Sequence, residues 1–370
     1  MKLAYITESM YNSGGIERVI SQKANWLSKQ KDIEVTIITY NNKNKPYYFK
    51  LNDSIYQINI ELNYHSNHSG REIRKELKQK LNALLNEKKF DICISTFGQE
   101  FFVLNQIKDG SKKIVEFHFS FEVNRFWQKD LSLSHKIMGM LKQIRMIYYG
   151  KQFSKIVVLT KSDLNKWKRY TKKVVQIYNP ITFETNDAST CENPQVIAVG
   201  RLDYQKGFDY LIKAWMYVDE VYPNWKLSIY GGGEKKDYEN LISNYSLKNK
   251  VLLRGVSSDI ISNYLDSSIF VLSSRYEGFP LVILEAMQCG LPIVSFNCPT
   301  GPNELITNSD NGFLVNKVGD IKGLADDIIK LIADNELRKE MGNKAKSTSM
   351  KFKVDNIMRQ WIMLFKELSC

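Results

Sequence analysis

The stretch IFVLSSRYEGFPLVILEAMQCGLPIVSF, residues 269–296, decides the fold. Residues 269–273 are a short apolar run rich in β-branched and aromatic side chains, which predicts a strand. Pro280 lies in the first turn of a predicted helix over 281–289, and a glycine and a proline then end this helix. Residues 293–296 predict a second strand. Strand, helix and strand in this order indicate a parallel α/β sheet.

Two glutamates stand out in this stretch. Glu277 follows the first strand, and in parallel sheets ligands bind outside the carboxyl ends of the strands. The start of the next helix offers unpaired N–H groups and positive potential, which suit phosphate. Glu285 follows eight residues later, about two helical turns on. Carboxylates beside a phosphate-binding helix end predict a sugar-nucleotide site. The alternative is that both glutamates are ordinary solvated residues at a helix end.

The length and composition are those of a two-domain globular protein. The chain has 370 residues, 43% of them hydrophobic and 25% charged. No apolar run reaches the roughly 18 to 20 residues that a membrane-spanning helix needs. The N-terminal residues do not resemble a secretory signal, so we expect a cytoplasmic protein. The five cysteines form no C-x-x-C pair, which argues against disulfides or a zinc site.

Positive charge is concentrated in the first half of the chain. Residues 1–180 hold 31 Lys and Arg against 16 Asp and Glu, whereas residues 181–370 hold 21 against 24. A basic half predicts an anionic partner, which could be a membrane surface, a phosphorylated acceptor or nucleic acid. Nucleic acid is the weakest of these options because no recognition-module signature is present.

Two segments of the basic half combine cations with apolar side chains. Residues 71–89 predict an amphipathic helix that packs its leucines on the core or lies on a membrane surface. Residues 126–149 are rich in bulky apolar and cationic residues and could lie on a bilayer or grip a lipid-linked substrate.

Two further candidates lie in the first half. Gly14 and Gly15 follow a predicted strand over 3–7 and precede a helical pattern, so a ligand could approach the backbone there. An ordinary strand-to-helix turn explains them equally well, and the spacing is not that of the dinucleotide fingerprint. His118 comes directly after a predicted strand over 113–117 and could face a cleft, although a structural histidine is the alternative.

Basic residues also follow predicted strands of the second half. Arg201 and Lys206 come after a strand over 195–199, and their side chains could converge on one diphosphate. Structural salt bridges are the competing interpretation. Arg254 and Val256 follow a strand over 251–253 and form a candidate edge for a nucleobase.

The domain boundaries follow from these patterns. Residues 1–180 predict a first domain, and residues 194–351 a second one. The polar, patternless segment 181–193 predicts a linker between them. A helix over 352–370 could pack back on the first domain.

Three motifs carry a resemblance to a known family. GRLDYQKG at 200–207 resembles a G-R-x-x-x-x-K-G segment, EGFPLVILE at 277–285 an E-x7-E motif, and NGFLV at 311–315 an N-G-x-L-V motif. These motifs and their order are similar to those of the retaining glycosyltransferases of family 4. The resemblance implies the α/β GT-B fold, in which two Rossmann-like parallel-sheet domains face a central cleft. It implies that residues 1–180 form the acceptor-binding Rossmann-like domain and residues 194–351 the nucleotide-sugar-binding one.

The resemblance also implies roles for individual residues. Arg201 and Lys206 would bind the donor diphosphate, Glu277 would be catalytic beside the transferred sugar, and Glu285 would bind ribose hydroxyls. Gly15 and His118 match first-domain positions near the donor phosphates and sugar. The backbone lining the sugar would come from Gly278, Phe279, Pro280 and Leu281.

The implied reaction is transfer of a hexose or N-acetylhexosamine to a glycan or lipid-linked saccharide, in the biosynthesis of a surface polysaccharide such as lipopolysaccharide or capsule. CPTGPNE at 298–304 is similar to segments of UDP-sugar users, which favours a UDP donor over a GDP donor. Family members generally need no metal and no redox cofactor. A sugar-nucleotide or glycan-binding protein without turnover is the alternative from another class.

Overall fold

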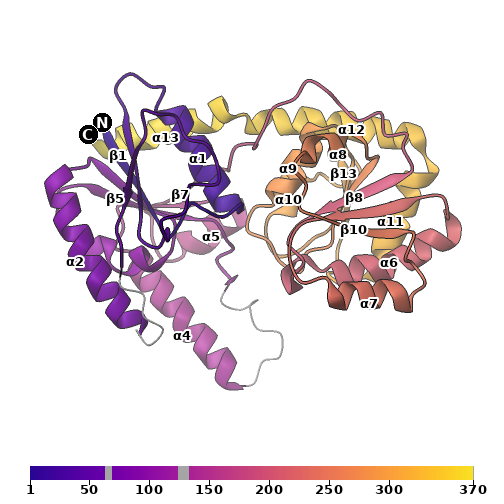
Figure 1. Cartoon of the computed structure of the whole chain (residues 1–370), viewed down its shortest axis with the longest axis horizontal. Coiled ribbons are helices and arrows are strands. Elements are labelled where there is room, and N and C mark those ends of the chain that lie inside the picture. Colours follow the sequence, from indigo (N-terminus) through magenta and orange to yellow (C-terminus); the bar gives the residue numbers. More distant parts are fainter. Residues whose placement is uncertain (63–68, 124–132, 370) are drawn as a thin grey trace. The chain divides into compact units, whose positions relative to one another are not determined.

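The computed structural model describes residues 1–62, 69–123 and 133–369. The chain forms two compact units (Figure 1). The first consists of Met1–Pro180 and Val354–Cys370, and the second of Ile181–Lys353. The chain therefore passes between the units twice, after Pro180 and after Lys353.

The first unit is built on a seven-stranded parallel sheet with the order β3-β2-β1-β4-β5-β6-β7. Its strands are β1 (Lys2–Thr7), β2 (Glu34–Thr39), β3 (Tyr56–Asn59), β4 (Ile92–Ser95), β5 (Lys112–Phe117), β6 (Lys155–Val158) and β7 (Val174–Gln176). The central strands β1 and β4 are apolar runs because both of their faces are covered.

Helices cover both faces of this sheet (Figure 1). The helices of the unit are α1 (Gly15–Leu27), α2 (Gly70–Lys88), α4 (Leu133–Gly150), α5 (Lys161–Lys168) and α13 (Val354–Ser369), with the 3₁₀ turns η1 (Gln99–Phe102) and η2 (Leu104–Gln106) after β4. Side chains of α2, α4 and α5 pack on one face, and those of α1 and α13 on the other. Of the predicted segment 126–149, residues 126–132 lie outside the described residues.

The second unit has a six-stranded parallel sheet with the order β10-β9-β8-β11-β12-β13. Its strands are β8 (Gln195–Val199), β9 (Lys226–Tyr230), β10 (Val251–Gly255), β11 (Ile269–Leu272), β12 (Ile293–Phe296) and β13 (Gly312–Val315). The helical segments are η3 (Tyr204–Lys206), α6 (Phe208–Val221), α7 (Lys236–Asn244), α8 (Ile260–Leu265), α9 (Leu281–Gln288), α10 (Pro302–Leu305), α11 (Ile321–Ala333), α12 (Asn335–Ser349) and η4 (Met350–Phe352). The strand order reverses between β8 and β11, and such reversals are where parallel sheets bind ligands.

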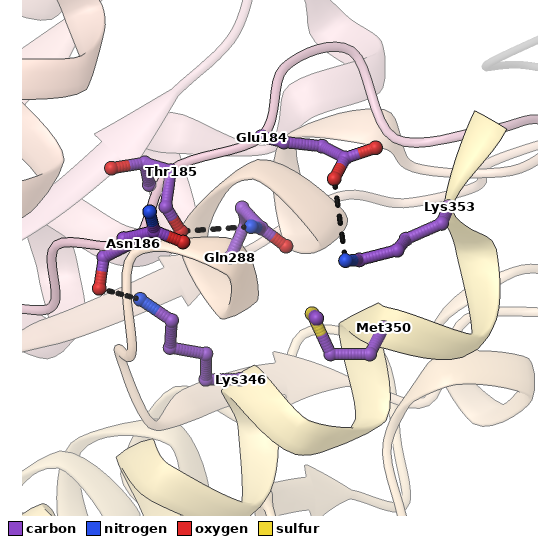
Figure 2. A pocket seen from close by; sticks show the side chains of 7 residues that line it. All are labelled: Glu184, Thr185, Asn186, Gln288, Lys346, Met350 and Lys353. Atoms are coloured by element: carbon purple, nitrogen blue, oxygen red, sulfur yellow. Dashed lines mark hydrogen bonds and ion pairs between the residues drawn. The ribbon is translucent and has the colours of Figure 1, made fainter.

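The predicted linker, residues 181–193, belongs to the second unit. Thr182 donates a hydrogen bond to Glu285, and Cys191 is buried. The segment also borders a hollow of about 340 Å³ (Figure 2), lined by Glu184, Thr185, Asn186, Gln288, Lys346, Met350 and Lys353. Polar groups of this segment bind residues of α9, α12 and η4. Lys353 pairs with Glu184 at 3.4 Å, and Gln288 donates to the Thr185 carbonyl at 3.1 Å.

Candidate active site

The loops that follow β8 and β11 meet because these strands are neighbours in the second sheet. Lys206 Nζ donates to Glu277 Oε1 at 2.7 Å, and Ser274 Oγ donates to the same oxygen at 2.6 Å. Both charged side chains are sheltered, with exposures of 14% for Lys206 and 6% for Glu277. The structure thus brings together a cation and a carboxylate that are 71 positions apart in the chain.

The backbone around Lys206 is tightly constrained. The Asp203 side chain accepts a hydrogen bond from the Lys206 N–H at 3.1 Å, and Ser273 Oγ donates to the Lys206 carbonyl at 2.9 Å. Gly207 has φ +62°, and a Cβ at this position would lie 2.2 Å from the Ser273 carbonyl oxygen. Only glycine fits a left-handed turn against another backbone, so Gly207 lets the lysine loop approach β11.

Arg275 joins the same two loops and was not assigned a role from the sequence. Its guanidinium donates to both carboxylate oxygens of Asp209, at 2.8 and 2.7 Å. It also lies 4.0 Å from the ring centroid of Tyr204 and 4.1 Å from that of Tyr210. Asp209 is 66 positions away in the chain, so no local pattern could have revealed this pair.

The carboxylate of Glu285, predicted to bind ribose hydroxyls, has protein partners on both oxygens. Oε1 accepts from Thr182 Oγ1 at 2.7 Å, and Oε2 accepts from Tyr264 O–H at 3.0 Å. Each carboxylate oxygen can accept a further hydrogen bond. Its role toward ribose therefore stays a prediction.

The segment before α9 carries the residues predicted to line the sugar. Pro280 is the N-cap of α9, one position before the predicted first turn, and Leu281 begins the helix. Gly278 is half-buried, whereas Phe279 is buried with its ring 6.0 Å from that of Phe352. Backbone N–H groups at this helix start, next to Glu277, favour an anion.

The loop after β12 supports Glu277 as well. Thr300 Oγ1 donates to the backbone carbonyl of Glu277. A Cβ at Gly301, which has φ +99°, would lie 2.6 Å from Pro280 Cδ. The CPTGPNE loop therefore positions the start of α9. Sequence reasoning singled this loop out for the donor but gave no role to Thr300 itself.

The other predicted donor contacts lie along the same edge of the second sheet. Arg201 is exposed and pairs with Asp203 at 3.2 Å, not with Glu277. Such exposed ion pairs are weak, so a ligand could displace it. Arg254 and Val256 lie at the end of β10, and the Val256 side chain is exposed. The Leu202 N–H donates to the Gly232 carbonyl at 2.8 Å, which ties the loop after β8 to the loop after β9.

The first unit holds the remaining candidates. Gly15 begins α1, with Gly14 as its N-cap. His118 follows β5, and its side chain is only 4% exposed. Burial lowers the pKa of His118 to about 4, although Glu116, whose carboxylate lies 3.6 Å from His118 Nε2, acts in the opposite direction. The imidazole is therefore neutral at pH 7.

A buried ionic cluster adjoins His118. Lys23 on α1 donates to Glu116 on β5, and both side chains are fully buried. Lys23 Nζ also lies 4.4 Å from the ring centroid of Trp361 on α13. Burial raises the pKa of Glu116, but the charge of Lys23, joined in acid by that of protonated His118, outweighs this and holds the pKa of Glu116 below its usual value. Sequence reasoning missed this cluster because its members are spread over three distant segments.

The described ranges contain no cluster of metal ligands and no membrane-spanning helix. No three His, Cys, Asp or Glu side chains in residues 1–62, 69–123 and 133–369 are grouped to hold a metal ion. Within the same ranges, no helix has both the length and the apolar character needed to cross a bilayer.

Sequence comparisons cover both units. Residues 13–185 match the Glycosyltransferase Family 4 model, and residues 184–348 match the Glycosyl transferases group 1 model. A glycosyltransferase of Haemophilus influenzae is 31% identical over 369 residues, covering 97% of this chain and 98% of the relative. An amylovoran biosynthesis glycosyltransferase of Erwinia amylovora is 28% identical, covering 97% of this chain and 98% of the relative.

A third relative comes from Campylobacter jejuni. It is the GalNAc-α-(1→4)-GalNAc-α-(1→3)-diNAcBac-PP-undecaprenol α-1,4-N-acetyl-D-galactosaminyltransferase. It is 27% identical over 382 residues and covers 100% of this chain and 99% of the relative.

Solved structures share the fold at lower identity. A mutant of S. aureus TarM in complex with fondaparinux, α-GlcNAc-glycerol and UDP superposes with a TM-score of 0.80 at 17% identity, covering 98% of this chain and 99% of that chain. Sucrose-phosphate synthase from Thermosynechococcus elongatus superposes with a TM-score of 0.82 at 18% identity, covering 99% and 98%. The chain belongs to glycosyltransferase family 4 and has the GT-B fold of two Rossmann-like parallel-sheet domains.

Proposed function

We propose that the protein is a retaining glycosyltransferase that moves a hexose or N-acetylhexosamine from a UDP-sugar to a glycan or lipid-linked saccharide, in the biosynthesis of a surface polysaccharide. The observation that carries this proposal is the Lys206–Glu277 pair, which lies where β8 and β11 end. The UDP in the TarM complex supports the donor. The names of the Erwinia and Campylobacter relatives support the pathway and the lipid-linked acceptor.

The chemistry suits these groups. When the bond between the sugar C1 and the diphosphate breaks, negative charge grows on the departing UDP. The acceptor hydroxyl oxygen forms the new bond to C1, and its proton passes to the departing diphosphate. Lys206, Arg201 and the start of α9 supply positive potential for that charge. Glu277 is placed to hold both Lys206 and a sugar hydroxyl. In the first unit, Gly15 would approach the donor phosphates, and the neutral His118 would donate a hydrogen bond to the sugar. Arg254 and Val256 would contact the base.

The proposal includes transfer without a metal ion, because side chains and helix starts supply the positive charge that the leaving group needs. It also places the protein at the cytoplasmic face of the membrane, because a lipid-linked acceptor would lie there.

Three variants test the assigned site. Lys206→Ala removes the cation, and Glu277→Gln removes the carboxylate charge at nearly constant volume. We expect each to lower kcat/KM by about a hundredfold or more, because a preorganised charge in a sheltered site is worth several kcal/mol in the transition state. Lys322→Ala is the matched control, since Lys322 is an exposed lysine of the same unit that pairs only with its helix neighbour Asp326 among the ion pairs of the described residues.

The readout is sugar transfer and UDP release, with circular dichroism to confirm that each variant is folded. Wild-type activity in Lys206→Ala or Glu277→Gln would remove the basis for the assigned roles. Stabilisation of the wild-type protein by UDP-sugars and by GDP-sugars in thermal unfolding decides between the two nucleotides. Donor binding without UDP release at any acceptor would favour the non-catalytic alternative.

A further inference from the structure

Helix α4 exposes an unusual amount of apolar surface. Seven of its large apolar side chains are between 50% and 75% exposed: Leu133, Ile137, Met138, Met140, Leu141, Ile144 and Tyr148. The buried residues of this 18-residue helix are Gly139, Met146 and Gly150. The helix packs on its own domain through this side and leaves the seven large apolar side chains exposed.

The exposed side chains form one stripe. At about 100° per residue, all of them except Met138 fall within an arc of roughly 100°. Gly139, Met146 and Gly150 fall on the roughly opposite side of the helix. The apolar stripe therefore faces away from the core of the first unit.

Cations flank the stripe. Residues 133–150 contain Lys136, Lys142 and Arg145 and no Asp or Glu. By the same angular count, Lys136 lies on one side of the stripe and Arg145 on the other, whereas Lys142 lies farther round, toward the buried side of the helix. Arg145 also packs 4.4 Å from the ring centroid of Phe102, which anchors this side of the helix on η1. Apolar side chains between cations that can reach phosphates are the pattern of a helix lying in a membrane interface.

The positive charge of α4 favours an anionic lipid surface over a second copy of the chain as the partner of the stripe. Two copies of the chain that met through α4 would bring three cations against three cations, with no acidic residue of the helix to compensate. An anionic lipid surface offers both an apolar layer for the stripe and phosphates for the cations. The net positive charge of residues 1–180 also favours an anionic lipid surface.

We propose that α4 lies in the interface of an anionic bilayer, with the stripe in the boundary between headgroups and acyl chains. This inference deepens the proposed function and rests on it for its purpose, because an acceptor carried on a lipid lies at that surface. The helix binds the bilayer through apolar insertion and through charge, and each contribution can be removed separately.

The first test removes the apolar stripe. The variant Ile137→Ser/Leu141→Ser/Ile144→Ser is compared with the full chain in sedimentation with vesicles of phosphatidylcholine in which about a quarter of the lipid is phosphatidylglycerol. We expect the affinity for these vesicles to fall about tenfold or more. The control variant Val221→Ser/Met363→Ser removes exposed apolar side chains elsewhere, 54% and 71% exposed, and should bind as the wild type does.

The second test removes charge and locates the helix. Lys136→Gln/Lys142→Gln should weaken binding about five- to tenfold or more, with the remaining binding less sensitive to salt. A fluorophore on Met140→Cys should shift to the blue with vesicles, while one on Met363→Cys should not. Both variants also carry Cys370→Ser, because the other four cysteines are buried.

Several outcomes would overturn the inference. One is failure of the wild type to sediment with the anionic vesicles, and another is binding of these vesicles by the serine variant as tight as that of the wild type. A dimer in analytical ultracentrifugation that the serine variant abolishes, without vesicle binding, would instead identify a second copy as the occupant. Transfer of the sugar from a UDP-sugar to a soluble acceptor, measured by the UDP released, separates the two proposals. Loss of vesicle binding with this activity intact removes only the membrane inference, and vesicle binding without any activity removes only the proposed function.

Discussion

Lys23 and Glu116 form a buried ion pair, and its contribution to the stability of the first unit can be measured. Lys23→Met leaves the Glu116 carboxylate buried without its cation, so we expect the first unit to lose about 3 to 5 kcal/mol of stability. In Lys23→Met/Glu116→Leu both charges are gone, and we expect the loss to be largely recovered. Hydrogen exchange of β5 in urea measures the free energy of unfolding of this unit. Equal stability of Lys23→Met and the wild type would contradict the prediction.

His118, which adjoins this cluster, makes the stability of the folded state depend on pH. Burial lowers its pKa from 6.5 to about 4, so the unfolded chain binds a proton in this window and the folded chain does not. The stabilisation is therefore complete above pH 6.5 and is lost as the pH falls toward 4, with a slope of up to about 1.4 kcal/mol per pH unit from this residue. Urea unfolding at several pH values should show a shallower slope for His118→Gln. Parallel slopes for the two proteins would show that His118 titrates normally.

At the scale of elements, the turn between η3 and α6 depends on a glycine. Gly207→Ala must adopt a left-handed conformation and also place its Cβ against the Ser273 carbonyl. We expect a loss of more than about 2 kcal/mol in the second unit and a displaced Lys206, with transfer reduced accordingly.

Gly110→Ala provides the matched comparison. It has φ +89°, and no atom of the described residues lies within 4 Å of its added Cβ. We expect this variant to lose only about 1 to 2 kcal/mol of folding stability, because alanine disfavours the left-handed conformation. Thermal unfolding that shows the same loss for both variants would mean that β11 can move away from the turn.

At the scale of the whole molecule, α13 belongs to the first unit although it follows the second in sequence. Trp361 and Phe365 are fully buried in its core, with α1 and β1. We expect Trp361→Ala to destabilise the first unit by about 3 to 5 kcal/mol and to leave the second unit unchanged. Met363→Ala, on the exposed side of α13, is the control. Hydrogen exchange of β1 and β8 reports the two units separately, and equal losses in both would show that they unfold together.

Much of the local structure could be predicted from the sequence. The predicted strand over 269–273 and helix over 281–289 match β11 and α9 to within one residue, and the GT-B fold is confirmed. Apolar periodicity and turn residues act over a few positions, so one sequence suffices to detect them. Lys206 and Gly207 could be singled out from the sequence for the same reason, because they lie in one short motif.

The contacts between distant segments were decided by the tertiary structure. Lys206 meets Glu277, and Lys23 meets Glu116, across 71 and 93 positions. The polar segment 181–193 packs on the second unit for a similar reason, because its partners lie on α9 and α12. The sequence by itself determined which residues form strands, turns and helices. Which of those residues touch was decided by the order of the strands in each sheet and by the packing of helices on it, because both depend on the whole unit and on no local pattern.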